Sequence, residues 1–479
     1  MSELVTAYLP EFVILIFVVF NIVGALFFGT NSYKLSKWIT LLGIVMAIAS
    51  TFYLQIEPDV YVFNGTFLTN IYTVFFKILI LMAGFFLTLL SRNMLREKKD
   101  RAFEYFSVFL SGLLFSMCAI SSVNFIVLYV SLSALSLCCY LLLVFNKKQN
   151  SKQLTFGYLI QNSFAYILFL GGLSFIYGIS SQFGFEEISS FLSKMDFANQ
   201  PQLLLSLSLI LVMCIHLFKL GVVPFSSWLP DTFEGASPPI GAYLSTIPVV
   251  ASIGVLARLF MVFLNYTIAI KIVFAVVSII TIIFGSFSAI RQKKLCRFMA
   301  YSMSVQSGIM LLGLCVFSVY SLSAVLFYLF CYLFINIGIW AAVILLNDSS
   351  RLESLDDIKG LIYTRPYFVT AFTMLLISMA GLAPTCGFIS KLYVFSAVAR
   401  SGFVYLPILV IALLAMVIML YAYWCVIKVM YQKVQVVPKI DCNIISSKFI
   451  LYACSIISVT ICFYADKLIH LCQLVAYFM

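Results

Sequence analysis

The sequence predicts an all-α polytopic membrane protein with about fourteen transmembrane helices. Hydrophobic residues form 63% of the 479 residues, charged residues form only 10%, and the mean hydropathy is +1.10. Apolar stretches of about 20 residues, long enough to cross a hydrocarbon layer of about 30 Å, recur along the whole chain. Because backbone polar groups in lipid must be paired within the protein, we expect these stretches to be helices. No soluble domain fits between them.

The apolar stretches fall into four segments. Three lie in an N-terminal segment, residues 1–100, and the last is a C-terminal helix within residues 440–479. Between them, residues 104–262 and 267–430 each hold five stretches, and we predict two inverted five-helix repeats. Residues 1–29 lack a basic leader and a small-residue cleavage site, so we expect a retained helix rather than a signal peptide. The predicted spans are 7–29, 36–55, 70–92, 104–121, 123–145, 154–178, 202–225, 237–262, 267–290, 297–318, 321–346, 368–399, 404–430 and 448–469.

Basic residues collect in alternate loops. The loops after odd-numbered spans hold them, whereas the intervening loops hold almost none apart from Lys194 and Arg400. By the positive-inside rule the basic loops are cytoplasmic, which places both termini on the outer side of the membrane. We expect an integral protein of a bacterial plasma (inner) membrane. The net charge of +11 is thus explained by topology and not by binding of nucleic acid.

Cysteine and histidine usage gives no sign of a metal or redox centre. The thirteen cysteines are scattered without a C-x-x-C pair, and only His216 and His470 are present. Small apolar filler residues are the favoured interpretation of the cysteines. A glycine-rich phosphate loop and an acidic metal cluster are also absent from the sequence. We therefore expect no catalytic residue and no metal in this chain.

A few charged residues fall inside predicted spans, where a charge at mid-bilayer costs about 2.5–3.5 kcal/mol on insertion scales. Three lie near span ends, where a long side chain can reach the interface. We expect those three to be interfacial and interpret Glu11 and Lys77 as internal structural ions or partner contacts. The residues near span ends are Arg258, Lys271 and Lys428.

Lys219 and Lys391 differ because each accompanies a predicted helix break. In "FKLGVVPF" Lys219 precedes Gly221 and Pro224, and in "ISMAGLAPTCGFISKLYVF" Lys391 follows Gly381 and Pro384. A proline removes one helical hydrogen bond and frees a carbonyl. Broken helices at corresponding positions of two repeats indicate an ion path. Burial disfavours the charged form of a lysine, so proton transfer is favoured over a static ion pair.

Five phrases together resemble the antiporter-like subunits of respiratory complex I. They are "FKLGVVPFSSWLPDTFEGASPPIGAYLST", "RFMAYSMSVQSGIMLLG", "YLFCYLFINIGIWAAVILL", "ESLDDIKGL" and "AGLAPTCGFISKLYVF". The "ESLDDIKGL" loop and the fourteen spans point within that group to subunit N, the counterpart of mitochondrial subunit 2. The resemblance covers about residues 100 to 430.

The resemblance implies a membrane-arm subunit of NADH:quinone oxidoreductase in which each repeat holds a half-channel for protons. Lys219 matches the family's lysine of the seventh helix, and Lys391 matches that of the broken twelfth helix. Quinone reduction elsewhere in the complex would drive proton movement. NADH, flavin, iron–sulfur clusters and quinone would belong to other subunits, so the implied partners are other membrane-arm subunits and the lipid bilayer.

Four positions depart from the family pattern. Ser133 stands where a glutamate that pairs with the seventh-helix lysine is expected, and Val249 stands where a central lysine is expected. Ser226 and Gln306 replace histidines. Without its carboxylate, Lys219 loses the partner that would stabilise its charge. We therefore expect an altered or impaired first half-channel.

Three side chains are candidate substitutes in a proton relay. Ser133 and Gln306 can form a hydrogen-bonded wire together with water, which Val249 cannot join through its side chain. His216 lies one turn before Lys219 on the same helix face and is either a relay group or, the favoured interpretation, a packed histidine.

Two other functions remain open from the sequence. The chain is also compatible with a subunit of a multi-subunit cation/proton antiporter or of a membrane-bound hydrogenase. A third possibility is a structural subunit that completes a membrane arm and moves no protons.

Overall fold

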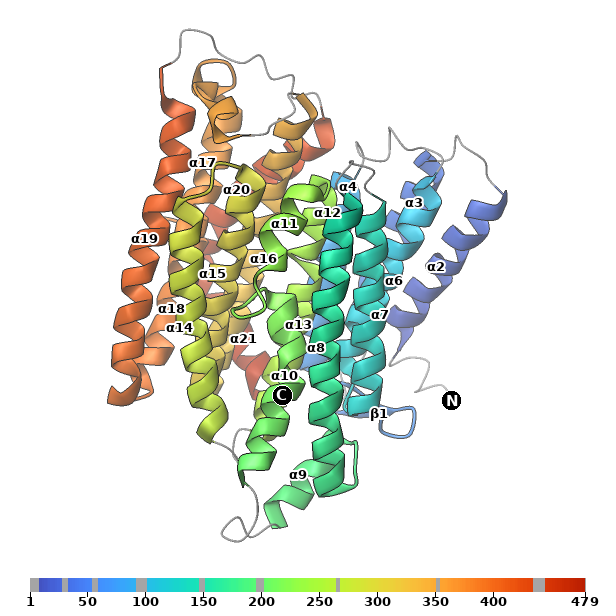
Figure 1. Ribbon diagram of the computed structural model, residues 1–479. Coiled ribbons are helices and arrows are strands. Elements are labelled where there is room, and N and C mark those ends of the chain that lie inside the picture. The colour runs from blue at the N-terminus through green and yellow to red at the C-terminus, as the bar shows by residue number, and fades with distance from the viewer. Residues whose placement is uncertain are drawn as a thin grey trace.

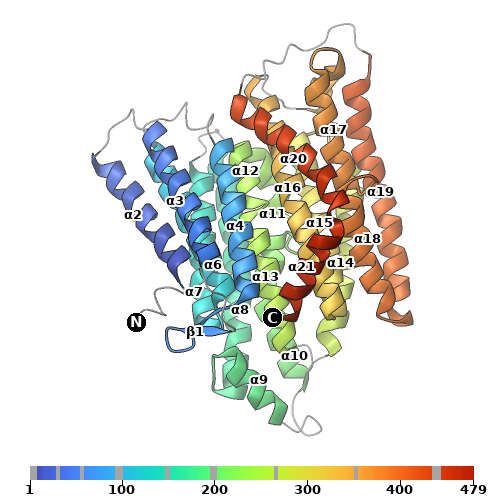
Figure 2. The same cartoon turned by 180° about the vertical axis from the view of Figure 1, so that it is seen from behind.

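The structure is a computed structural model that describes residues 8–27, 33–53, 59–91, 101–145, 151–194, 202–263, 268–349, 354–433 and 444–478. Helices dominate these residues and run side by side in one bundle, with α2 and α19 at opposite edges (Figures 1 and 2). Thirteen of the described helices are long and apolar enough to cross a membrane. The predicted all-α polytopic membrane fold is confirmed.

The N-terminal segment contains three long helices and a small hairpin. The helix after the hairpin begins at a capping box, because Asn70 accepts a hydrogen bond from the Thr73 amide at 3.0 Å. The hairpin is not expected from the sequence, because its strands are too short to show a two-residue period. The elements are α2 (Leu9–Phe27), α3 (Tyr33–Tyr53), β1 (Val60–Val62), β2 (Phe67–Thr69) and α4 (Ile71–Leu90).

The next predicted segment is also helical, but two of its spans are interrupted. The span predicted at 202–225 ends as a helix at Leu220, and the span predicted at 237–262 is divided near Ser245. The elements are α6 (Ala102–Ser121), α7 (Phe125–Val144), α8 (Ser151–Ser180), α9 (Phe185–Lys194), α10 (Gln202–Leu220), α11 (Trp228–Gly235), α12 (Pro238–Leu244) and α13 (Ile247–Phe263).

The remaining chain contains the second broken span. The span predicted at 368–399 forms two 15-residue helices, and the predicted C-terminal helix forms two helices that meet at Tyr464. The long elements are α14 (Ile268–Ile290), α15 (Leu295–Val316), α16 (Val319–Ser349), α17 (Pro366–Ala380), α18 (Cys386–Arg400), α19 (Leu406–Tyr431), α20 (Ile445–Phe463) and α21 (Ala465–Tyr477).

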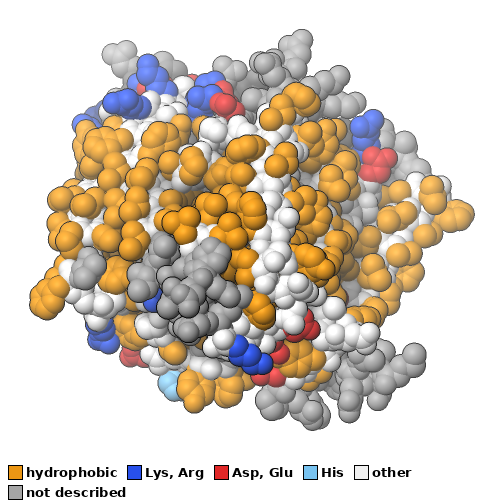
Figure 3. All heavy atoms as spheres, turned by 60° about the horizontal axis from the view of Figure 1, so that its bottom comes forward, with side chains coloured by type: hydrophobic (Ala, Val, Ile, Leu, Met, Phe, Trp, Pro, Cys, Tyr) orange, Lys and Arg blue, Asp and Glu red, His pale blue; other side chains and the backbone are white. Residues whose placement is uncertain are grey.

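Helices α13, α15 and α16 form the interior of the bundle. They are buried over most of their length, whereas α2, α3, α8, α14 and α19 leave most of their apolar residues uncovered. Large apolar side chains are spread over the side of the molecule seen in Figure 3, and the charged side chains in this view lie mostly toward its margins. Such uncovered apolar faces are expected of helices that contact lipid. The interior helices are therefore the ones that can carry polar groups away from lipid.

Arg258 corrects one expectation. Its side chain does not reach the interface but is buried, and it donates hydrogen bonds to the carbonyls of Ile120 at 2.7 Å and Ser122 at 3.1 Å. These carbonyls lie at the end of α6, where helical partners are missing and a cation is favoured. Arg258 thus fastens α13 to α6. Lys428 is exposed as expected, and Lys271 is partly exposed.

Candidate functional site

The first helix break lies directly after Lys219. Helix α10 ends at Leu220, and Gly221 takes the left-handed conformation with φ of +63°. A side chain at Gly221 would overlap Leu229, so glycine fits both the conformation and the space. Trp228 donates its indole N–H to the Phe218 carbonyl at 3.0 Å, which satisfies one acceptor near the helix end. The break after Lys219 is thus held by specific contacts of Gly221 and Trp228.

Lys219 is buried and has a serine as its partner. Its Nζ donates to Ser136 Oγ at 2.6 Å, and this hydroxyl also lies 3.0 Å from the Tyr166 hydroxyl. Among the residues that the structure describes, Lys219 forms no ion pair with a carboxylate. The amine of Lys219 is therefore bound to the Ser136 hydroxyl, which lies next to that of Tyr166, and not to a negative charge.

Two of the predicted relay residues do not join this site. The Ser133 hydroxyl donates to the Val130 carbonyl of its own helix at 2.9 Å, and the side chain is half-buried. His216 is buried, and both of its ring nitrogens lack a hydrogen-bond partner in the described parts of the chain. The contact from α7 is instead made by Ser136. It lies one turn after Ser133, and that spacing is the signal that sequence reasoning missed.

The second helix break precedes Lys391. Helix α17 ends at Ala380, and Gly381 caps it with φ of +84° before α18 starts at Cys386. A side chain at Gly387 would overlap the Ser378 carbonyl, so glycine lets the two half-helices approach closely. Lys391 is buried, and its Nζ donates to the Met379 carbonyl at 2.5 Å. That carbonyl lies in the last turn of α17, where helical donors are missing.

Gln306 connects Lys391 to a wider polar network. Its Nε2 lies 3.3 Å from the same Met379 carbonyl and 3.2 Å from the Tyr423 hydroxyl. Tyr328 donates its hydroxyl to Gln306 Oε1, and the Tyr423 hydroxyl lies 2.5 Å from Ser302 Oγ. Polar atoms thus run without interruption from Lys391 across α15 to α19. Sequence reasoning named Gln306 but missed both tyrosines, because a buried tyrosine looks like a core aromatic residue until its partner is known.

Helix α15 contacts both breaks. Ser304 Oγ donates to the Gly221 carbonyl at 2.8 Å, and Gln306, two residues later, donates to the Met379 carbonyl. The helix therefore reaches a carbonyl beside each lysine. Val249 is fully buried and contributes no polar atom.

A second polar contact lies where α12 and α13 are interrupted. Asn336 Nδ2 donates to Ser245 Oγ at 2.8 Å, and the Tyr332 hydroxyl donates to the Ser245 carbonyl at 3.0 Å. Both donors come from the interior helix α16. The middle of the bundle is thus polar at Ser245 although it is apolar at Val249.

An ion network holds the segment after the first break. Glu234 on α11 accepts from Lys294 at 2.6 Å and from Arg297, and Arg297 also binds Asp231 at 2.7 Å. Partial burial opposes ionisation of Glu234, but the hydrogen bonds from Lys294 and Arg297 outweigh it, so the pKa of Glu234 lies below its usual value. The network joins α11 to the start of α15.

Replacing Glu234 by Gln should lower thermal stability at neutral pH but not in acid. A carboxyl with a depressed pKa stabilises the folded state above the unfolded pKa, and this contribution is lost as pH falls through the folded pKa. The ion pairs of Glu234 with Lys294 and Arg297 are partly exposed to solvent, which screens them. We therefore expect the free energy of unfolding to fall by roughly 0.2–1 kcal/mol. Thermal melting of Glu234→Gln at neutral and acidic pH checks this, with exposed Glu187→Gln as the control. An equal loss at both pH values would contradict the ionic origin.

Comparison with known proteins identifies relatives over most of the chain. The family model described as "NADH:quinone oxidoreductase/Mrp antiporter, TM" matches residues 122–418. NADH-quinone oxidoreductase subunit N of Paramagnetospirillum magneticum is 34% identical over 374 residues, which cover 77% of this chain and 76% of the relative. The chloroplastic NAD(P)H-quinone oxidoreductase subunit 2 of Mesostigma viride is 30% identical, covering 90% of this chain and 85% of the relative.

Solved structures share the fold at lower identity. A chain of respiratory complex I from Thermus thermophilus has a TM-score of 0.80 at 21% identity, covering 96% of this chain and 98% of that chain. A chain of an archaeal membrane-bound sulfane sulfur reductase has a TM-score of 0.88 at 20% identity, covering 98% of this chain and 97% of that chain. A chain of the Mrp complex from Dietzia sp. has a TM-score of 0.84 at 16% identity, covering 99% of this chain and 97% of that chain. The fold alone therefore does not distinguish these complexes.

Proposed function

The chain belongs to the NADH:quinone oxidoreductase/Mrp antiporter transmembrane family, and within it to the subunit N group of complex I; on this basis we propose that it is a proton-moving membrane-arm subunit of NADH:quinone oxidoreductase. NADH, flavin, iron–sulfur clusters and quinone are bound by other subunits in this proposal. Quinone reduction there drives proton movement here. The partners are the other membrane-arm subunits and the lipid bilayer.

The observation that carries the proposal is the placement of two buried lysines beside two helix breaks. Lys219 and Lys391 each donate to an uncharged oxygen, so either can lose its proton without leaving a carboxylate unpaired. Buried ionisable groups at membrane depth are expensive and usually mark ion routes. We assign proton transfer to these two lysines, in two inverted repeats formed by residues 104–262 and 267–430.

The two lysine sites are unequal. Lys391 adjoins the continuous network of Gln306 and its tyrosines, whereas Lys219 donates only to Ser136, whose hydroxyl in turn lies 3.0 Å from that of Tyr166. Protons moving between the sites would pass along α15, from the Gly221 carbonyl and Ser304 toward Gln306. The first half-channel is therefore altered, and the second is the better connected one.

The proposed location is a bacterial plasma (inner) membrane with both termini on the outer side. The start of α2 and the end of α21 lie toward the same end of the bundle (Figure 2), as expected when the broken span of α17 and α18 is added to the thirteen longer helices. The alternation of basic residues along the sequence supports a cytoplasmic position for the other end.

Purification from native membranes in mild detergent tests the assignment. We expect this chain to co-purify with flavin and iron–sulfur subunits and with NADH–quinone oxidoreductase activity. Partners limited to small hydrophobic antiporter subunits, or hydrogenase subunits in place of the NADH-oxidising ones, would overturn it. The fold shared with a chain of the Mrp complex makes the antiporter the relevant alternative among the solved structures.

A further inference from the structure

The Met379 carbonyl beside the second helix break accepts hydrogen bonds from two side chains. Lys391 Nζ lies 2.5 Å from this oxygen, and Gln306 Nε2 lies 3.3 Å from it. Both side chains are buried. One donor can change its charge, whereas the other is a neutral amide. The end of the amide that faces Met379 therefore also decides what the amine of Lys391 meets.

The hydrogen bonds of Gln306 fix the direction of its amide. A carbonyl oxygen only accepts hydrogen bonds, so the Met379 carbonyl requires the NH2 end of Gln306. The second hydrogen of that NH2 group is directed to the Tyr423 hydroxyl at 3.2 Å. Oε1 of Gln306 is then left for Tyr328, whose buried hydroxyl donates to it. Among the described residues, Tyr328 is thus the donor that holds the oxygen end of the amide.

This orientation keeps a donor, and not an acceptor, beside Lys391. The NH2 end of an amide only donates, so it offers no hydrogen bond to an ammonium. The oxygen end would accept from the ammonium in a charge-assisted hydrogen bond. Because Nε2 and Nζ contact the same oxygen, a reversed amide would bring Oε1 next to Lys391. The observed direction of Gln306 therefore favours loss of the proton from Lys391.

We propose that Tyr328 is a positioning residue for Lys391, because its hydroxyl holds the Gln306 amide with the NH2 end toward the Met379 carbonyl. When Lys391 gives up its proton, this carbonyl keeps Gln306 as a donor. Without the Tyr328 hydroxyl, the buried Oε1 lacks a donor, and turning the amide toward the ammonium removes that penalty. The role rests on the proton-transfer function proposed for Lys391.

Charged side chains near Lys391 do not account for such an effect. None of the described residues forms an ion pair with Lys391, and no charged group acts on it electrostatically. The neutral titratable groups Tyr328 and Tyr423 reach it through Gln306. Helix α18 packs mainly against α15, α16, α17, α19 and α20. The charged side chains described on these helices and on α18 itself lie in first or last turns and are Arg297, Arg400, Lys428 and Lys448.

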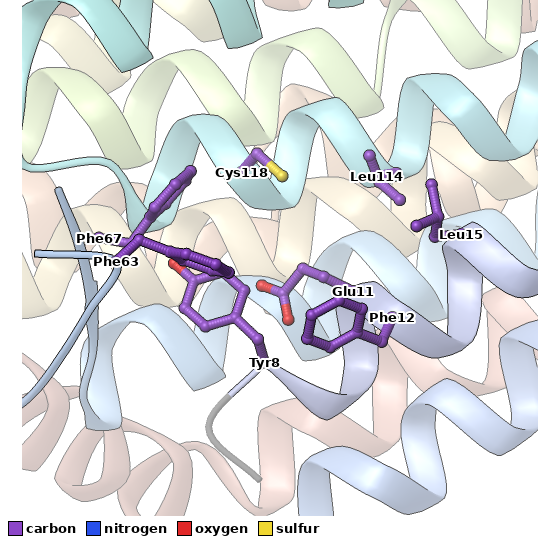
Figure 4. A pocket seen from close by; sticks show the side chains of 8 residues that line it. All are labelled: Tyr8, Glu11, Phe12, Leu15, Phe63, Phe67, Leu114 and Cys118. Atoms are coloured by element: carbon purple, nitrogen blue, oxygen red, sulfur yellow. The ribbon is translucent and has the colours of Figure 1, made fainter. Parts of the chain in front are cut away.

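The buried ion pair of the N-terminal segment is also separate from this network. Lys77 Nζ on α4 is 2.7 Å from Glu11 Oε1 on α2. Figure 4 shows Glu11 at the start of α2 with the rings of Tyr8 and Phe12 beside it. Neither α2 nor α4 is among the helices with which α18 makes its main contacts. A pH effect that depends on Tyr328 therefore reports on Lys391 and not on this pair.

Replacing Tyr328 by Phe tests the proposal in the purified complex reconstituted into vesicles. The ratio of protons moved to NADH oxidised is measured over a series of pH values. In Tyr328→Phe, Oε1 of Gln306 turns to the ammonium of Lys391 and retains the proton. The acidic limb of the pH profile should therefore move to higher pH, by about one unit for one charge-assisted hydrogen bond.

Two further variants separate positioning from general damage. Tyr332→Phe removes a buried hydroxyl one turn later on α16, which donates to the Ser245 carbonyl and not to Gln306. It should leave the position of the acidic limb unchanged. Gln306→Leu removes the amide, so adding Tyr328→Phe to it should cause no further shift. An unmoved limb in Tyr328→Phe, or an equal shift in Tyr332→Phe or in the Gln306→Leu background, would overturn the proposal.

Infrared spectroscopy gives a second measurement that does not depend on proton pumping. In a complex with isotope-labelled glutamine side-chain carbonyls, the band that is missing from Gln306→Leu belongs to Gln306. This band should shift in Tyr328→Phe, because the carbonyl loses its donor, and should stay in place in Tyr332→Phe. An unshifted band in Tyr328→Phe would contradict the positioning role. A shifted band together with an unchanged proton-to-NADH ratio in Lys391→Met would confirm the orientation of Gln306 and overturn the proton-transfer function instead.

Discussion

Replacing Lys391 by Met should lower the number of protons moved per NADH oxidised, and should lower it more than replacing Lys219 by Met. A positioned acid–base group accelerates proton transfer by about 100- to 10,000-fold, so proton flux through this subunit should fall by about 100-fold or more. Met keeps the length and packing of the side chain but cannot donate to the Met379 carbonyl. The loss at Lys219 is smaller because its amine donates to a serine rather than to a carboxylate, and because the buried Val249 adds no polar side chain.

Reconstituted vesicles give the measurement, as the ratio of proton uptake to NADH oxidation. The matched Lys219→Met variant is compared in the same preparation, and Lys428→Met, an exposed lysine, controls for loss of a positive charge. Equal and complete losses from both buried lysines would argue against unequal half-channels. If neither replacement changes the ratio, the chain is a structural subunit that moves no protons.

The sequence predicts the framework well because its signals are local. Length and hydropathy locate the spans, and glycine with proline locates the breaks at Gly221 and Gly381, where the structure ends α10 and α17. The interruption near Ser245 was missed although Pro248, in the first turn of α13, is a signal for a helix start. There, Ser245 and Thr246 hydroxyls bond to the Ala242 carbonyl of the preceding turn, a competition with helical bonding that composition does not reveal.

The polar contacts of the site were harder to predict because they join distant parts of the chain. Gln306 and Tyr423 are 117 residues apart, and Lys219 and Ser136 are 83 apart. Ser133 was expected at the position of a carboxylate that pairs with Lys219. Its short side chain donates a hydrogen bond to the Val130 carbonyl of its own helix instead. From the sequence, Glu11 and Lys77 were interpreted as internal structural ions or partner contacts, and the structure places them 2.7 Å apart as a buried pair between α2 and α4.

Replacing Gly381 by Ala should reduce both the stability of the complex and the protons moved per NADH. Gly381 has φ of +84°, a conformation that costs a residue with a side chain about 1–2 kcal/mol. The added Cβ would also lie 2.7 Å from Lys391 Cδ, so the lysine must shift and its hydrogen bond to Met379 must lengthen or break. Thermal melting measures the first effect, and the proton-to-NADH ratio in vesicles measures the second.

Gly402 offers a matched control for this substitution. It also has a positive φ, +118°, but within the described part of the chain no atom beyond its own neighbours lies within 4 Å of the position that a Cβ would take. Gly402→Ala should therefore lower the melting temperature through backbone strain while leaving the proton-to-NADH ratio unchanged. If Gly402→Ala and Gly381→Ala reduce the ratio equally, the loss reflects general destabilisation. A loss confined to Gly381→Ala means instead that the placement of Lys391 against the break sets the rate of proton transfer.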